Sequence, residues 1–94
     1  MTKNDNSVWV FHGMRGQFAS AVFADMSAAD AWIAKHRLTG ILTEYPVGVG
    51  IYEWAVERGT FTPKKPHHST PEFIGTFTSA SQDHHHYEDG VRQT

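Results

Sequence analysis

Short apolar runs, separated by glycine and proline, alternate along this chain with polar stretches, a pattern typical of a small domain that mixes strands and helices. Residues 8–12 are β-branched or aromatic on both faces, which predicts an interior strand ending at Gly13. Residues 18–24 predict a second strand. Because only a short turn at 15–17 separates these runs, we expect them to pair as an antiparallel hairpin.

The following segment predicts a helix over 27–38. Ser27 has the side chain of an N-cap, Asp30 follows it at the spacing of a capped first turn, and Gly40 ends the pattern. At helical periodicity one face carries small and aromatic side chains that suit packing against a sheet. The residues on this face are Ala28, Ala29, Trp32, Ile33 and His36.

Two further strands are predicted after this helix. Residues 41–45 predict a third strand that Pro46 ends, and residues 47–52 predict a fourth strand whose glycines indicate a bulge. Residues 53–58 are ambiguous. They form either a short helical turn with Gly59 just beyond its end, which we favour, or a continuation of the strand.

The last third of the chain is mainly polar. Residues 60–70 predict a loop, and Pro71 after Ser69 or Thr70 predicts one helical turn with a hydroxyl cap. From residue 78 onward, apolar residues are few. We expect this stretch either to lie on the domain as an extended strand or to be partly disordered.

These elements predict an α+β fold, with a small antiparallel sheet of about four strands and one main helix packed on one face. The expected organisation is a flexible arm at 1–7, a single domain at 8–77 and a histidine-rich polar tail at 78–94. The tail could fold back on the domain. The expected core consists of Val8, Val10, Phe11, Phe18, Val22, Phe23, Trp32, Ile33, Ile41, Ile51, Trp54 and Phe73.

Composition narrows the classes of function. The net charge is −2 with neutral histidine, and no long basic stripe exists, which argues against binding to nucleic acid. The chain contains no cysteine, which excludes disulfides and thiolate chemistry and fits a reducing compartment. No apolar run approaches the length of a membrane span, so we expect a cytoplasmic protein without membrane contact.

Three adjacent histidines give the clearest chemical signal. In an extended segment, His84, His86 and Glu88 point the same way, and two imidazoles with one carboxylate could be three ligands of a zinc ion. Water or another histidine, such as His12 or His68, would complete the site. The alternative is a solvated or surface-packed tail that binds nickel or zinc only adventitiously.

The other histidines have simpler interpretations. His67 and His68 precede Ser69 and Thr70, an arrangement that can support phosphate or acyl chemistry, but a turn with a Ser or Thr cap before Pro71 is the favoured interpretation. His36, on the apolar face of the predicted helix, is expected to be a core residue bonded to a carbonyl group rather than a catalytic base. The same role is expected for His12, which lies at the end of a predicted strand.

Several blocks of the sequence resemble an uncharacterised family of small bacterial proteins, a domain of unknown function. The blocks that carry this resemblance are residues 8–13, 32–40, 43–50, 71–75 and 84–90. The resemblance spans nearly the whole chain after residue 7 and implies that the histidine-rich segment belongs to the natural protein. It implies no activity and no catalytic residue.

The sequence therefore favours a small non-enzymatic binding or accessory module. Its 12 aromatic residues are more than one helix can cover, so we expect an open aromatic sheet face, with Trp9 and Tyr45 as candidates. The simplest partner is a second copy of the chain, giving a homodimer. The alternative is a metal-binding protein or metal-dependent hydrolase that uses His84, His86 and Glu88 with another histidine.

Overall fold

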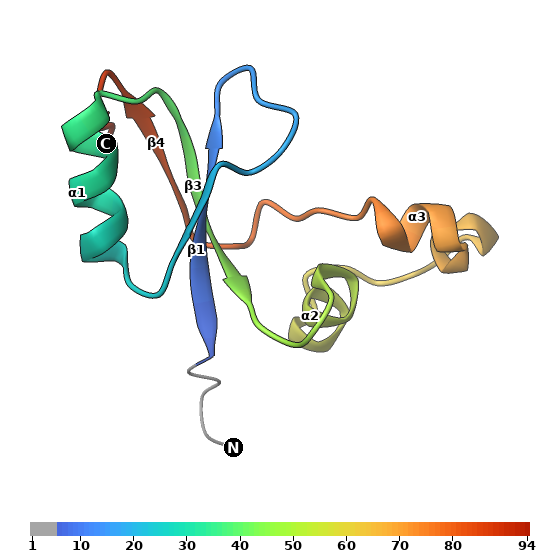
Figure 1. Cartoon of the computed structure of the whole chain (residues 1–94). Helices are drawn as coiled ribbons and strands as arrows, with labels where there is room; N and C mark the ends of the chain where they lie inside the picture. Colours follow the sequence, from blue (N-terminus) through green and yellow to red (C-terminus); the bar gives the residue numbers. More distant parts are fainter. Residues whose placement is uncertain (1–5) are drawn as a thin grey trace. The chain divides into compact units, whose positions relative to one another are not determined.

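The computed structural model describes residues 6–94 and divides them into two compact units (Figure 1). Residues 6–47 and 82–94 form one unit, here called the sheet unit, and residues 48–81 form the other, here called the helical unit. Residues 1–5 of the expected arm lie outside the described residues. Ser7 already belongs to the first strand.

The sheet unit contains an antiparallel sheet in the order β2-β1-β3-β4-β5. Its strands are β1 Ser7–Gly13, β2 Ala21–Phe23, β3 Gly40–Pro46, β4 His84–Glu88 and β5 Val91–Arg92. The predicted α+β class is confirmed, with five strands in place of the four expected. The additional pairing comes from the polar segment after residue 78, which supplies β4 and β5.

Helix α1, Met26–His36, begins one residue earlier than predicted. Its N-cap is Asp25, whose carboxylate accepts a hydrogen bond from the backbone N–H of Ala28 at 2.8 Å, so Ser27 lies inside the first turn. The helix ends at Arg37, which adopts the left-handed conformation with φ 56°. The prediction ended the helix at residue 38, which is two residues too late.

Gly40 has a different role at the start of β3. A Cβ atom at this position would collide with the carbonyl oxygen of His12 and would lie 2.7 Å from the ring of Phe11. The absence of a side chain therefore lets β3 approach β1 closely where the core is most tightly packed.

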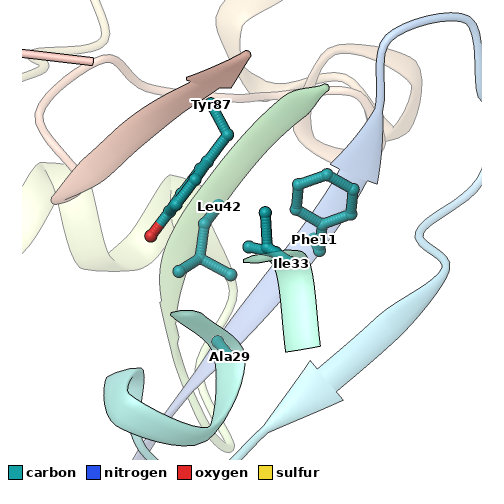
Figure 2. Packing of buried hydrophobic residues seen from close by; sticks show 5 residues of the cluster. All are labelled: Phe11, Ala29, Ile33, Leu42 and Tyr87. Carbon is teal, nitrogen blue, oxygen red and sulfur yellow. The ribbon is translucent and has the colours of Figure 1, made fainter. Parts of the chain in front are cut away.

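The core of the sheet unit joins one helix to three adjacent strands. Figure 2 shows Phe11 of β1, Leu42 of β3 and Tyr87 of β4 lying near Ile33 and Ala29 of α1. Each of these residues is at most 2% exposed. Trp9, Ala21, Phe23, Met26, Trp32 and Leu38 pack around them as partly buried residues.

The predicted core was correct for Phe11 and Ile33 and wrong for three other residues. Phe18 is 77% exposed because β2 begins at Ala21, which leaves residue 18 in the preceding loop. Val22 and Ile41 are exposed because they lie on the sheet face opposite α1. In β3 it is Leu42, not its neighbour, that faces the helix.

The helical unit contains α2 Ile51–Arg58, the 3-10 helix η1 Pro66–Ser69 and α3 Pro71–Gly75. The predicted strand over 47–52 was wrong, because Gly48 has φ 89° and Gly50 caps α2. The favoured helical interpretation of 53–58 is confirmed, and Gly59 ends the helix at φ 78°.

Across residues 6–94, no helix has both the length and the apolar character required to cross a membrane.

Candidate functional site

Strand alternation divides the sheet residues between two faces. Trp9 and Phe11 of β1 contribute to the core beside α1. Their neighbours in the strand, Val8, Val10 and His12, therefore point to the other side of the sheet. Residues directly opposite in antiparallel strands share a face, and the observed register extends this face over all five strands. The resulting surface, here called the open face, consists of Val8, Val10, His12, Val22, Ile41, Thr43, Tyr45, His84, His86, Glu88 and Val91.

The open face exposes large aliphatic side chains. Val22 is 61% exposed, Val91 63% and Ile41 37%. Within the described part of the sheet unit, α1 is the one helix, and it packs on the opposite face. No element of this unit therefore covers these side chains.

The expected aromatic character of this face is corrected by the structure. Trp9 lies on the helix side, where its ring is 5.8 Å from that of His85 and it packs against the core. Tyr45 pairs with Val8 and lies on the open face as expected. The surface therefore combines five aliphatic side chains with three histidines, Thr43, Tyr45 and Glu88.

His84 and His86 lie together on this face. Both side chains are exposed, and their ring centroids are 5.5 Å apart. The Nδ1 atom of His84 is 2.8 Å from the carbonyl oxygen of Gln82. Because a carbonyl oxygen only accepts hydrogen bonds, Nδ1 carries the proton in this bond, and Nε2 of the neutral ring keeps its lone pair.

The residue that holds His84 is itself firmly anchored. Gln82 is 3% exposed, and its side-chain amide donates to the carbonyl oxygen of Glu44 at 3.0 Å. The backbone N–H of Glu44 in turn donates to the carbonyl oxygen of Asp83 at 2.9 Å. These bonds fix the start of β4 against β3.

Glu88 follows the histidine pair on the same face by strand alternation. Among residues 6–94, however, no three His, Asp or Glu side chains are gathered in a group able to hold a metal ion. His12 pairs with Ile41, which pairs with His86, so one strand separates the two imidazoles. The three-ligand zinc site at His84, His86 and Glu88 stays a prediction.

His36 does not have the core position expected for it. It is exposed at the last residue of α1, and its ring lies edge-on to Trp32 with centroids 5.7 Å apart. The apolar stripe of the helix is narrower than the periodicity suggested, since it ends at Ile33 on the buried side.

His68 has a structural position in the helical unit. Its Nδ1 atom accepts hydrogen bonds from the backbone N–H groups of Lys64 at 3.0 Å and Lys65 at 3.2 Å. Its ring packs 4.8 Å from Phe73. Burial lowers the pKa of His68, and the nearby positive charges of His67 and Lys65 lower it further.

Thr70 confirms the predicted capped turn. Its hydroxyl accepts from the backbone N–H of Phe73 at 3.2 Å and donates to the carbonyl oxygen of His67 at 2.9 Å. The hydroxyl is thus engaged with the backbone at the start of α3. The capped-turn interpretation accounts for this segment.

Tyr87 is an important residue that the sequence did not single out. Its ring is buried in the core, and its hydroxyl donates to a carboxylate oxygen of Asp30 in α1 at 2.8 Å. Burial and this hydrogen bond together raise the pKa of Tyr87 to about 12. One apolar residue within a polar segment was the available signal.

The sheet with a helix on one face and an aliphatic, histidine-bearing opposite face defines a small α+β protein. The model of the family described as Domain of unknown function (DUF7710) matches residues 8–93, so the chain belongs to this family. The expected membership of a family of unknown function is confirmed. No curated protein and no solved structure matches the chain.

Proposed function

We propose that this protein is a small non-enzymatic binding or accessory module of the cytoplasm, and that a second copy of the chain associates with its open face. The lack of cysteine in all 94 residues suits a reducing compartment. The observation that carries the proposal is the exposure of Val22, Ile41 and Val91 on one face of one sheet.

The shape of the sheet favours contact through its face over contact through its edges. The edge strands β2 and β5 have three and two residues, respectively. Such short edges offer few unpaired backbone groups to an added strand. The broad surface between them offers aliphatic side chains from β1, β2, β3 and β5.

The charge of the open face suits a second copy. Among the residues assigned to this face, Glu88 is the one carboxylate, and there is no lysine or arginine. Two copies related by a two-fold axis bring the same surface together, so a nearly uncharged apolar face avoids like-charge repulsion. A strongly acidic partner would find no lysine or arginine on this face, and a strongly basic partner would find one carboxylate.

Sedimentation of the full chain across concentrations from about 1 μM to about 1 mM tests the proposal. We expect a monomer–dimer equilibrium that Val22→Glu weakens at least about tenfold, because the change places a charge in an apolar contact. Met14→Glu is the matched control, since Met14 is 65% exposed but lies in a turn outside the sheet.

A monomer at every concentration would contradict the proposal. Equal loss of association in the two variants would also contradict it, because the effect would then follow total charge and not the open face. Loss in Val22→Glu alone would support the proposed surface.

A further inference from the structure

We propose that His84 and His86 form a two-imidazole chelate for a divalent first-row transition ion such as Zn²⁺ on the open face. This inference goes beyond the proposed self-association and does not depend on it. It also differs from the three-ligand site predicted from the sequence, because Glu88 is not required as a ligand.

The separation of the two rings fits a shared ion. In a tetrahedral site, two imidazole nitrogens about 2.0–2.1 Å from zinc place their ring centroids roughly 5 Å apart. The observed centroid separation between His84 and His86 is 5.5 Å. The two rings therefore lie at a separation compatible with a shared ion.

The hydrogen bond of His84 also directs the ring nitrogen that a metal ligand needs away from the backbone. Its Nδ1–H donates to the carbonyl oxygen of Gln82 at 2.8 Å, which leaves the Nε2 lone pair available. Histidines that bind metals commonly donate their second ring nitrogen to a carbonyl or carboxylate in this way. Because Gln82 is buried and bonded to Glu44, the acceptor is itself fixed.

The strand that carries the pair is well supported. β4 lies inside the sheet, paired with β3 on one side and with β5 on the other. Tyr87 lies between His86 and Glu88 in sequence and anchors the opposite side of β4 in the core. A rigid platform keeps two ligands in place at a lower entropic cost than a solvated tail.

The local charge favours a cation. Glu88 lies on the same face, one alternation beyond His86, and no lysine or arginine belongs to this face. Two protein ligands leave two tetrahedral positions for water or for groups of a second chain. The stoichiometry of binding distinguishes these two possibilities.

The experiment is a calorimetric titration of the full untagged chain with ZnCl2 in a non-coordinating buffer. We expect one ion per chain with water as the remaining ligands, or one ion per two chains if a second copy supplies them. Both His84→Ala and His86→Ala should weaken binding at least about tenfold, because each removes half of the chelate.

His12→Ala is the matched control, since His12 is exposed on the same face but separated from the pair by β3. The zinc affinity of this variant should equal that of the unsubstituted chain. Nitrogen NMR shifts of the histidine rings provide a second readout, and we expect zinc to perturb Nε2 of His84 while Nδ1 stays protonated.

Unchanged affinity in both His84→Ala and His86→Ala would overturn the inference and show adventitious binding only. Equal weakening by His12→Ala, or coordination of His84 through Nδ1, would overturn it as well. Sedimentation in the presence of a chelator separates this inference from the proposed function, because dimerisation without metal leaves the proposed function intact.

Discussion

At the scale of single residues, Tyr87 connects the C-terminal segment to the helix. Its ring is 2% exposed and fills the core, and its hydroxyl reaches Asp30 in α1. One side chain thus supplies both an apolar and a polar contact between β4 and α1. This explains how a mainly polar segment is held in the sheet.

Tyr87→Phe should lower the free energy of unfolding by about 1.5–3 kcal/mol at pH 7, the usual net value of a hydrogen bond to a charged group, because the acceptor is the carboxylate of Asp30. Chemical denaturation measures the change. Tyr45→Phe, on the open face, is the control and should have a smaller effect. Equal losses in both variants would contradict the role assigned to the bond with Asp30.

The raised pKa of Tyr87 predicts a loss of stability at alkaline pH. Because tyrosine ionises near pH 10 in the unfolded chain and near 12 in the folded one, the unfolded state loses its proton first. The contribution is complete below pH 10 and decreases as the pH rises from 10 to 12. Tyr87→Phe should lack this component in denaturation curves recorded across that range.

The lowered pKa of His68 predicts a loss of stability at acidic pH. Its folded pKa lies below the ordinary value of 6.5, so the unfolded chain takes up a proton first as the pH falls. The contribution is present above pH 6.5 and is lost as the pH falls through the lowered pKa. Protonation of Nδ1 also removes the acceptor for Lys64 and Lys65.

Hydrogen exchange of residues 48–81 measured between pH 7.5 and 5 tests this effect, after correction for intrinsic exchange. As the pH falls, protection of these amides should decrease in the unsubstituted chain. In His68→Gln, protection should change little with pH. His36→Gln is the control and should keep the decrease. A decrease that persists in His68→Gln would assign the effect to another group.

At the scale of elements, the first turn of α1 distinguishes two neighbouring candidate caps. Asp25→Ala should cost about 1 kcal/mol, because it removes the acceptor for the N–H of Ala28. Ser27→Ala should change stability by less than about 0.5 kcal/mol. Thermal or urea unfolding compares the two, and a larger loss in Ser27→Ala would contradict the observed cap.

The orientation of β3 can be tested in the same way. Leu42→Ala should cost about 2–5 kcal/mol because the side chain is fully buried. Ile41→Ala, one residue earlier, should cost about 1 kcal/mol or less because it is 37% exposed. The reverse order would place β3 with its other face toward α1.

These elements also show how far the sequence could predict the fold. Residues 8–12 and the helix were recognisable because local periodicity and capping residues determine them. The sequence could not decide whether Ile41 or Leu42 faces the helix, because both are apolar and the pairing with neighbouring strands determines the orientation. For residues 84–88 the sequence left an extended strand and a partly disordered segment as alternatives, since their place in the sheet comes from pairing with β3.

The candidate site was predictable only within one strand. Alternation correctly places His84 and His86 on one side of β4, and their ring contact agrees with it. An open sheet face was expected, but most of its residues could not be predicted, because Val22 and His86 are brought to one surface through pairings between residues distant in sequence.

At the scale of the whole molecule, self-association and ion binding both depend on the sheet having two different faces. One face is covered by α1 and encloses the core, and the other presents aliphatic and histidine side chains. Association and ion binding are assigned to this same surface. The tests of both proposals therefore depend on one structural premise, namely that the open face is the surface that makes these contacts.

Methyl NMR spectra recorded during dilution of the full chain test this premise most directly. We expect the methyl groups of Val10, Val22 and Ile41 to shift together as the dimer dissociates. Val56, which is 38% exposed in the helical unit, should remain constant. Shifts at Val56 without shifts at Val22 and Ile41, or no shifts at all, would contradict the account.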